Sequence, residues 1–254
     1  ALKRIKAKGK VDFQLHYQSF AAQKAPEVKA YFSIKDGQLT EPQFGAQIQA
    51  LQCLGTYSNL PTDELKIEKF EFKSQGARFA GQLQLKDFLM PKLAVRANGN
   101  IPLALVQALY PLSSVDQVQG RAKVRVQAQL VQDDQRNWKT QTLKGQVGIQ
   151  ADHLQLTDFK KRFQGLVADI SFDEQDLRIN HFKATIGTTD LHAQLHIPDY
   201  SAQVNSSKPL QISGHLNAQR LDFSDFDTKT TSQKRTWILP QDISLSLPCQ
   251  IDQF

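Results

Sequence analysis

RAKVRVQAQL, residues 121–130, alternates between polar and apolar side chains at every position. The apolar members of the alternation are Ala122, Val124, Val126, Ala128 and Leu130. Successive side chains of a β-strand point to opposite faces, so the segment predicts a strand with one polar, solvent-exposed face and one apolar face, here called the dry face. The dry face needs a cover, and the nature of that cover decides the fold.

The same period of two recurs along the whole chain. It is found in segments 11–17, 30–34, 65–72, 79–85, 93–97, 147–156, 168–172, 177–179, 191–197, 210–212, 221–223 and 243–247. Lys69 and Gly81 interrupt the alternation and predict bulges. Residues 101–112 form the one helical pattern, which begins at Pro102 and is limited by Pro111 to about two or three turns. One short helix cannot cover more than a dozen strands.

An amphipathic sheet is covered by helices, by a second sheet or by something else. Because helices are too few, two all-β architectures stay open. One is a long antiparallel sheet curled into a groove that holds a ligand, with one short helix, and the other is a closed β-sandwich. No change of composition marks a firm domain boundary, and 254 residues suit either one large β domain or two smaller ones.

Composition excludes several classes of protein. Lys and Arg (31) exceed Asp and Glu (25) only slightly and are spread along the strands, and no nucleic-acid-binding motif is present. No apolar run approaches the ~18 residues of a transmembrane helix, and residues 1–10 lack the apolar core of a signal peptide. Cys53 and Cys249 are isolated from each other and from any metal-binding pattern, so we expect two unpaired thiols.

The sequence contains no constellation typical of an enzyme. GxSxG, P-loop and GxGxxG motifs are absent, so we expect no catalytic residues, no cofactor and no metal. His192 and His196 fall on the polar side of one strand but lie ~13 Å apart along it, which favours a solvated face over a shared metal. The acidic cluster at 173–176 lacks EF-hand spacing and is better explained as a polar hairpin turn.

Glycines and polar segments mark the connections. Gly99, Gly120, Gly145, Gly165, Gly187 and Gly214 follow one another at intervals of 20 to 27 residues. This spacing suits a hairpin-sized unit in which glycine allows a bulge or a sharp bend. Residues 199–209 and 224–236 are polar and predict loops.

Several longer phrases together resemble the AsmA-like family of bacterial envelope proteins, relatives of TamB and of the bridge-like lipid transfer proteins. ANGNIPLALVQALYPL (97–112) followed by VQGRAKVRVQAQL (118–130) is similar to the family's strand, glycine and short helix with a return strand. Residues 154–197 resemble its repeating unit, 208–226 the opening of a further repeat, and 237–254 the start of the next one. Residues 1–96 fit more loosely as one further unit.

The resemblance implies a single elongated β-groove segment over 1–254, with units at 1–96, 97–197 and 198–254. It implies that phospholipid or another acyl lipid is bound or conducted along an apolar groove, in support of lipid transport to, or homeostasis of, the outer membrane. The expected location is the periplasm of a Gram-negative bacterium. The chain is expected to be a soluble fragment of a parent that an N-terminal segment anchors in the inner membrane, with envelope proteins as further partners and no nucleic acid.

The residues expected to line the groove are the inward members of the alternation: Val124, Val126, Leu130, Val147, Ile149, Ile170, Phe172, Leu191, Leu195 and Ile212. Each of them would equally fit a closed core. Burial of each methylene of an acyl chain is worth about 0.8 kcal/mol without any directional bond, so such a wall needs no special polar site. The alternative is a structural or adaptor β module of the cell envelope that binds protein or glycan at its edges.

Overall fold

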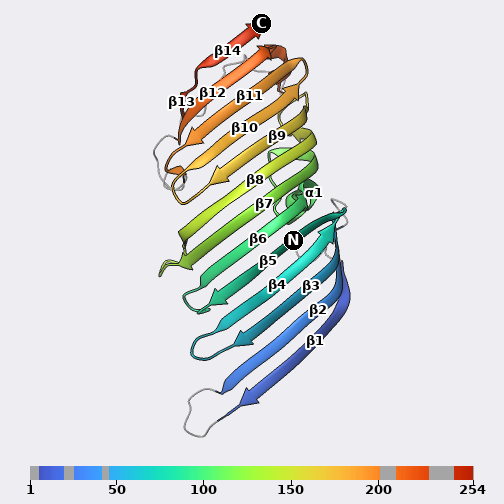
Figure 1. Cartoon of the computed structure of the whole chain (residues 1–254), viewed down its shortest axis with the longest axis vertical. Helices are drawn as coiled ribbons and strands as arrows, with labels where there is room; N and C mark the ends of the chain where they lie inside the picture. Colours follow the sequence, from blue (N-terminus) through green and yellow to red (C-terminus); the bar gives the residue numbers. More distant parts are fainter. Residues whose placement is uncertain (1–5, 20–25, 42–45, 201–209, 229–242, 254) are drawn as a thin grey trace. The chain divides into compact units, whose positions relative to one another are not determined.

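The computed structural model describes residues 6–19, 26–41, 46–200, 210–228 and 243–253. These residues form a single open sheet in which the strands follow chain order from β1 to β13, with β14 also pairing with β12 (Figure 1). The pairings from β1 to β6 and from β8 to β12 are antiparallel, whereas β13 and β14 both run parallel to β12. The expected class, an open and mainly antiparallel sheet with one short helix, is confirmed. The closed β-sandwich is wrong, because the described residues form one sheet and not two facing ones.

The chain divides into two compact units. Unit 1 contains residues 1–101 and 124–144, and unit 2 contains residues 102–123 and 145–254. The strands of unit 1 are β1 (Lys6–Gln18), β2 (Glu27–Glu41), β3 (Ala46–Ser58), β4 (Glu64–Ser74), β5 (Ala77–Lys86) and β6 (Lys92–Pro102). Two long strands contribute to both units: β7 (Val115–Gln132) and β8 (Trp138–Leu156).

Unit 2 adds the helical elements and the remaining strands. They are α1 (Leu103–Leu109), β9 (Phe163–Phe172), β10 (Leu177–Ile186), β11 (Thr189–Ile197), β12 (Leu210–Arg220), the 3-10 helix η2 (Phe223–Phe226), β13 (Ile243–Ser246) and β14 (Cys249–Gln253). The predicted polar loop at 224–236 begins within η2, and its residues 229–236 lie outside the described part of the chain. Of the loop predicted at 199–209, only residues 199 and 200 are described.

One of the two predicted bulges is present. The register of β4 against β5 shifts between Ile67 and Phe70, so the bulge expected at Lys69 is confirmed. The bulge expected at Gly81 is wrong, because β5 pairs with β6 without interruption through Gly81. Gly81 lies on the apolar side of β5 but has no side chain. In the sequence it therefore resembles an interruption, although the alternation of β5 continues unchanged through it.

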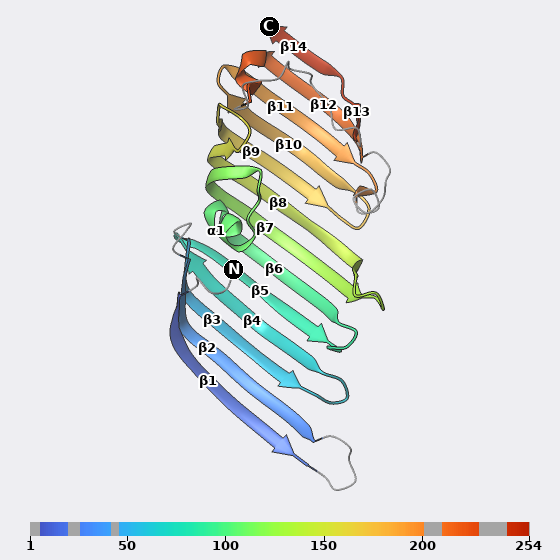
Figure 2. The ribbon, with the colours of Figure 1, turned by 180° about the vertical axis from the view of Figure 1, so that it is seen from behind.

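The helix predicted over 101–112 is confirmed in the shorter form of α1. Leu105 is 3% exposed, and Leu103 packs against a buried cluster formed by Ala151, Leu166, Ala168 and Ala184. The helix therefore lies on the apolar face of the unit 2 sheet, as seen from behind in Figure 2. It covers only a part of that face, because it has seven residues.

A buried glutamine fixes the chain after α1. The side-chain amide of Gln107 donates to the carbonyl oxygens of Leu112 (3.2 Å) and Val115 (3.1 Å), and its Oε1 accepts from the Leu112 amide (3.2 Å). We expect Gln107→Leu to lower the free energy of unfolding by about 1–3 kcal/mol, since it leaves these backbone groups without partners. Urea denaturation measures this. The control Gln150→Leu alters an exposed side chain of β8, and an equal loss in both variants would contradict the expectation.

Candidate functional site

The apolar side chains of unit 2 are aligned in rows that cross the strands. The strand register joins Val147 of β8, Ile170 of β9, Ile179 of β10 and Leu195 of β11 into one such row. A neighbouring row contains Ile149, Ala168, Phe182, Ala193 and Leu216, and a third contains Phe172, Leu177 and Ile197. These rows make up the apolar face of unit 2.

Burial on this face is uneven. Leu166 and Ile186 are buried, at 9% and 0% exposed, as are Ala151, Ala168, Ala184 and Ala193. Val147, Ile170, Ile179 and Leu195, which form one continuous row, are only half-buried. A second layer of protein would bury the tips of these large side chains. This row is therefore not fully covered by the described residues.

All ten residues predicted to line a groove are half-buried. Val124, Val126 and Leu130 belong to unit 1 and the other seven to unit 2. The structure pairs Val147 directly with Ile170, and it connects Ile170 with Leu195 through Ile179. The sequence analysis omitted Ile179 and Phe182 from the lining. A register shift between these two residues changes the phase of β10, and this hid the continuation of its apolar side.

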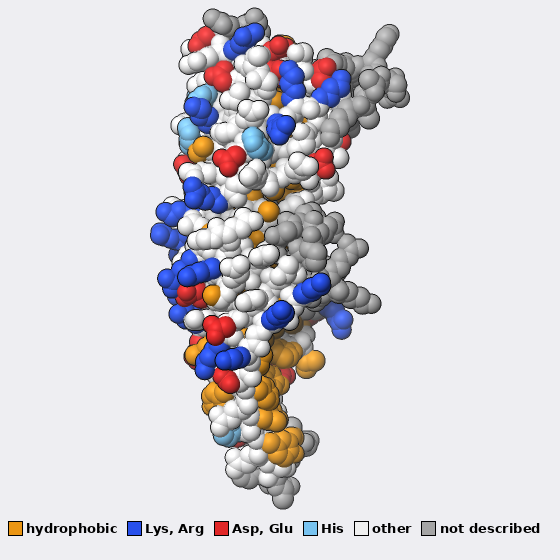
Figure 3. Space-filling model, turned by 90° about the vertical axis from the view of Figure 1, so that its right-hand side faces the viewer, with side chains coloured by type: hydrophobic (Ala, Val, Ile, Leu, Met, Phe, Trp, Pro, Cys, Tyr) orange, Lys and Arg blue, Asp and Glu red, His pale blue; other side chains and the backbone are white. Residues whose placement is uncertain are grey.

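Unit 1 has an apolar face built in the same way. One row contains Phe13, Phe32, Gly55, Ile67, Leu83 and Val95, and the next contains Leu15, Ala30, Tyr57, Leu65, Leu85 and Leu93. On β1 the apolar side chains are the most open, with Phe13 64% and Tyr17 65% exposed. Figure 3 shows hydrophobic side chains at the surface in the part of the molecule that β1 and its neighbouring strands form.

Two glycines of unit 1 are covered by aromatic rings. A Cβ atom on Gly55 would lie 2.3 Å from Cζ of Phe32, and one on Gly81 would lie 2.5 Å from Cζ of Phe70. Each ring thus lies over the neighbouring glycine. The rings shield the glycine backbone and hold part of the apolar face close to the sheet.

Both cysteines are free thiols, as expected. Cys53 lies in the apolar face of unit 1 between Ile34 and Phe70, and burial raises the pKa of its thiol. Cys249 is exposed. A raised pKa lowers the thiolate fraction, which argues against Cys53 as a nucleophile.

The opposite face of unit 2 is polar and carries the histidines considered above. Nε2 of His196 lies 3.1 Å from Oδ2 of Asp176, and Nε2 of His192 lies 3.9 Å from Oδ2 of Asp190. Hydrogen bonds from Arg178 and then His196 lower the pKa of Asp176. Within the described ranges, no group of three or more His, Cys, Asp or Glu residues is arranged to hold a metal ion.

The acidic cluster at 173–176 is a hairpin turn, as predicted. Oδ1 of Asp173 accepts hydrogen bonds from the backbone amides of Gln175 and Asp176, both at 2.9 Å. These bonds lower the pKa of Asp173. The turn joins β9 to β10.

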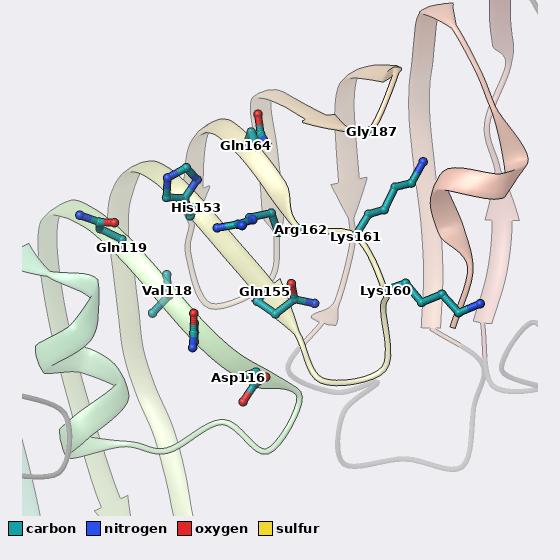
Figure 4. A pocket seen from close by; sticks show the side chains of 11 residues that line it. Asp116, Val118, Gln119, His153, Gln155, Lys160, Lys161, Arg162, Gln164 and Gly187 are labelled. Atoms are coloured by element: carbon teal, nitrogen blue, oxygen red, sulfur yellow. The ribbon is translucent and has the colours of Figure 1, made fainter. Parts of the chain in front are cut away.

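A polar pocket of about 720 Å³ lies at one end of the unit 2 strands. Its lining includes Lys160, Lys161 and Arg162 from the β8–β9 loop, together with His153 and Gln164 (Figure 4). Two of the three basic side chains from this loop form ion pairs within the protein. Lys161 forms an ion pair with Asp225, and Nζ of Lys160 lies 3.7 Å from Oδ2 of Asp227. The pocket is therefore a weaker candidate for ligand binding than the apolar faces.

Asp225 is the residue of this region that sequence analysis missed. It is fully buried, and its Oδ2 accepts hydrogen bonds from the backbone amides of Thr188 (2.8 Å) and Thr189 (2.9 Å) and from both hydroxyls. Burial alone would raise the pKa of Asp225, but Lys161 and the threonine donors outweigh it and hold the pKa well below its usual value. The carboxylate ties together three connections of unit 2, so its role is structural.

The fold and the candidate site define an open amphipathic sheet with an apolar face in each unit that the described residues leave partly uncovered. Comparisons of the chain with protein-family models, with curated proteins and with solved structures give no match. Among the described residues, no helix has the length and apolar character needed to cross a membrane.

Proposed function

We propose that this chain is a non-enzymatic protein segment that binds or conducts phospholipid acyl chains along its apolar sheet faces. The observation that carries the proposal is the half-buried state of large apolar side chains in continuous rows, such as Val147, Ile170, Ile179 and Leu195. Apolar area of this extent left in water lowers solubility and favours association. An acyl chain that lies along a row would remove both partners from water.

The uniformity of the rows supports a lipid over a compact ligand. Each methylene buried contributes about 0.8 kcal/mol, and the contribution does not depend on a particular polar group. The rows run from strand to strand, so a tail meets the same kind of wall at each step. In unit 1 the rings of Phe32 and Phe70 lie over two glycines of the face and shield the backbone there from such a tail.

The resemblance described above supplies the wider setting of the proposal. We assign the chain to an AsmA-like protein of the Gram-negative periplasm, whose parent is anchored in the inner membrane and which supports lipid transport to, or homeostasis of, the outer membrane. Phospholipid or another acyl lipid is then the partner, and envelope proteins are candidates for further contacts. The competing function is an adaptor β module whose apolar faces are covered by another protein.

The experiment is native mass spectrometry with organic extraction of the purified chain, compared with a variant that carries Ile170→Asp and Ile179→Asp. Ile170 and Ile179 face each other in one row, so the variant places two charges on the proposed path. The matched control is Ser171→Asp with Arg178→Asp, which changes the facing pair one position along the same two strands, on the polar face.

We expect phospholipid to be recovered from the wild type and the control and to be lost from the Ile170 and Ile179 variant. Circular dichroism establishes that all three proteins keep their strands. A wild type that carries no lipid and takes up none when it is added would reject the proposal in favour of the adaptor module. Equal lipid in all three would mean that lipid binds elsewhere than on this row.

A further inference from the structure

The turn between β5 and β6 in unit 1 presents three large apolar side chains to solvent. Phe88, Leu89 and Met90, here called the apolar turn, are 44%, 90% and 38% exposed. Gly, Pro, Asn, Asp and Ser dominate turn positions, for reasons of backbone conformation and hydrogen bonding. Folding of the chain gains little from Leu89, since almost all of its surface stays in water. Only Phe88 has an aromatic neighbour, Tyr57, with 6.0 Å between the ring centroids.

The backbone holds the apolar turn in place. Oδ1 of Asp87 accepts a hydrogen bond from the Met90 amide (3.1 Å), and the Asp87 amide donates to the carbonyl of Asp63 (2.7 Å). On the other side, the Gln132 amide donates to the carbonyl of Pro91 (2.9 Å). The apolar side chains are thus presented by a turn that is bonded to both neighbouring connections. A turn held in one conformation loses less conformational entropy on binding a partner than a flexible loop does.

Two lysines stand directly behind the apolar turn. Lys86 and Lys92 are register partners at the end of the β5–β6 ladder, and both are exposed. Like charges at facing positions destabilise a strand pair. Glu64 lies 3.8 Å from Lys86, whereas no carboxylate of the described residues forms an ion pair with Lys92. A surface of negative charge in front of the turn would relieve this repulsion.

Further apolar side chains lie along the same edge of unit 1. Leu60 in the β3–β4 turn is 37% exposed, and Trp138 at the start of β8 is 48% exposed. Figure 1 shows the β3–β4, β5–β6 and β7–β8 connections following one another along this edge. Apolar side chains at the end of a turn, followed by lysines, match the arrangement of a bilayer surface. The apolar side chains would contact the acyl chains, and the lysines would contact the anionic headgroups.

We propose that the apolar turn inserts into the surface of a bilayer that contains anionic phospholipid, with Lys86 and Lys92 at the level of the phosphates. This inference goes beyond the proposed function, because it concerns how the chain meets a membrane and not what its apolar faces hold. It also makes a separate prediction: the residues of the apolar turn affect membrane association but not the lipid carried by the protein.

The experiment is flotation of the purified chain with vesicles of phosphatidylcholine, with and without a minority of phosphatidylglycerol. Phe88→Ser with Leu89→Ser removes the apolar tip, and Lys86→Gln with Lys92→Gln removes the charges. The control is Tyr31→Ser with Leu54→Ser, which removes one exposed aromatic and one exposed leucine side chain (47% and 49% exposed) from strand positions of the same unit. Organic extraction of each protein measures its bound lipid in parallel.

We expect the tip variant to partition at least about ten-fold more weakly into both kinds of vesicle, which is the change that burial of one large apolar side chain brings. The lysine variant should lose the preference for phosphatidylglycerol, and the control should behave as the wild type. A wild type that stays unbound, or a control that falls as far as the tip variant, would overturn the inference. Extracted lipid unchanged across the variants would leave the proposed function intact in either case.

Discussion

Asp225→Ala is expected to lower the free energy of unfolding by about 2–5 kcal/mol, because it leaves several buried hydrogen-bond donors without an acceptor, at about 1–3 kcal/mol each. The substitution leaves the Lys161 ammonium without its carboxylate and the Thr188 and Thr189 amides without an acceptor. Urea denaturation measures the loss, and amide hydrogen exchange at residues 187–189 locates it. The control Asp169→Ala changes an exposed carboxylate of β9 and should stay within about 0.5 kcal/mol of the wild type.

The contribution of Asp225 also depends on pH. Its folded-state pKa is depressed, so the stabilisation is complete above the unfolded-state pKa of about 4 and is lost as the pH falls from there toward the folded-state value. The difference in unfolding free energy between the wild type and Asp225→Ala should therefore be constant near neutral pH and shrink below about pH 4. A difference that stays the same into the acid range would show that the charge of Asp225 does not stabilise unit 2.

Gly214→Ala is expected to cost about 2–4 kcal/mol, because neither the backbone conformation nor the space around Gly214 admits a side chain. Gly214 has φ +150°, and a Cβ atom there would lie 1.9 Å from the carbonyl oxygen of Gln194 on β11. That neighbour is backbone in a paired strand, so β11 and β12 would have to separate locally. Thermal or urea unfolding measures the loss.

Gly148→Ala provides the matched control. Gly148 lies in β8 of the same unit, and a Cβ atom there would meet only the side chain of Asp169 at 3.3 Å and Cβ of Lys123 at 4.0 Å. We expect no loss of stability, or a small gain from the reduced freedom of the unfolded chain. Equal destabilisation by both substitutions would mean that loss of glycine itself matters, and not the close approach at Gly214.

The series of regularly spaced glycines shows how much backbone geometry the sequence pattern could predict. Gly99, Gly120 and Gly214 all have φ between 138° and 150°, and in each a carbonyl oxygen of the neighbouring strand occupies the space of a Cβ atom. The expectation of special backbone geometry is confirmed at these three positions. Gly165 (φ 56°) lies near the start of β9 at a register shift against β10, so the expected bulge is also confirmed there. Gly187 (φ 59°) lies in the turn between β10 and β11. Gly145 is not among the glycines with positive φ, so the series joins different uses of glycine.

The candidate site was only partly predictable. Alternation alone placed Val147, Ile170 and Leu195 on the apolar side, and all three lie there half-buried. Ile179 alternates with Leu177 but was not named among the lining residues, and Phe182 was not marked because the β10 register shift after Ile179 changes the phase. Nor did the alternation mark Phe88, Leu89 and Met90, since a turn has no period from which exposure can be read.

The sequence by itself determined most of the strands, the short helix α1 and the amphipathic character of the sheet, because each of these depends on side chains a few residues apart. It did not mark β3 or β14, and the strand expected at 221–223 is wrong, because η2 begins at Phe223. Tertiary structure alone decided what covers the apolar side. Three features depend on contacts between distant parts of the chain. They are the register of the strands, the packing of α1 through Leu103, and the burial of Asp225, whose partners lie 36 to 64 residues earlier in the sequence. For the strand RAKVRVQAQL, whose residues from Val124 onward belong to unit 1, the apolar face remains half-buried because the described part of the chain forms no second sheet that could close over it.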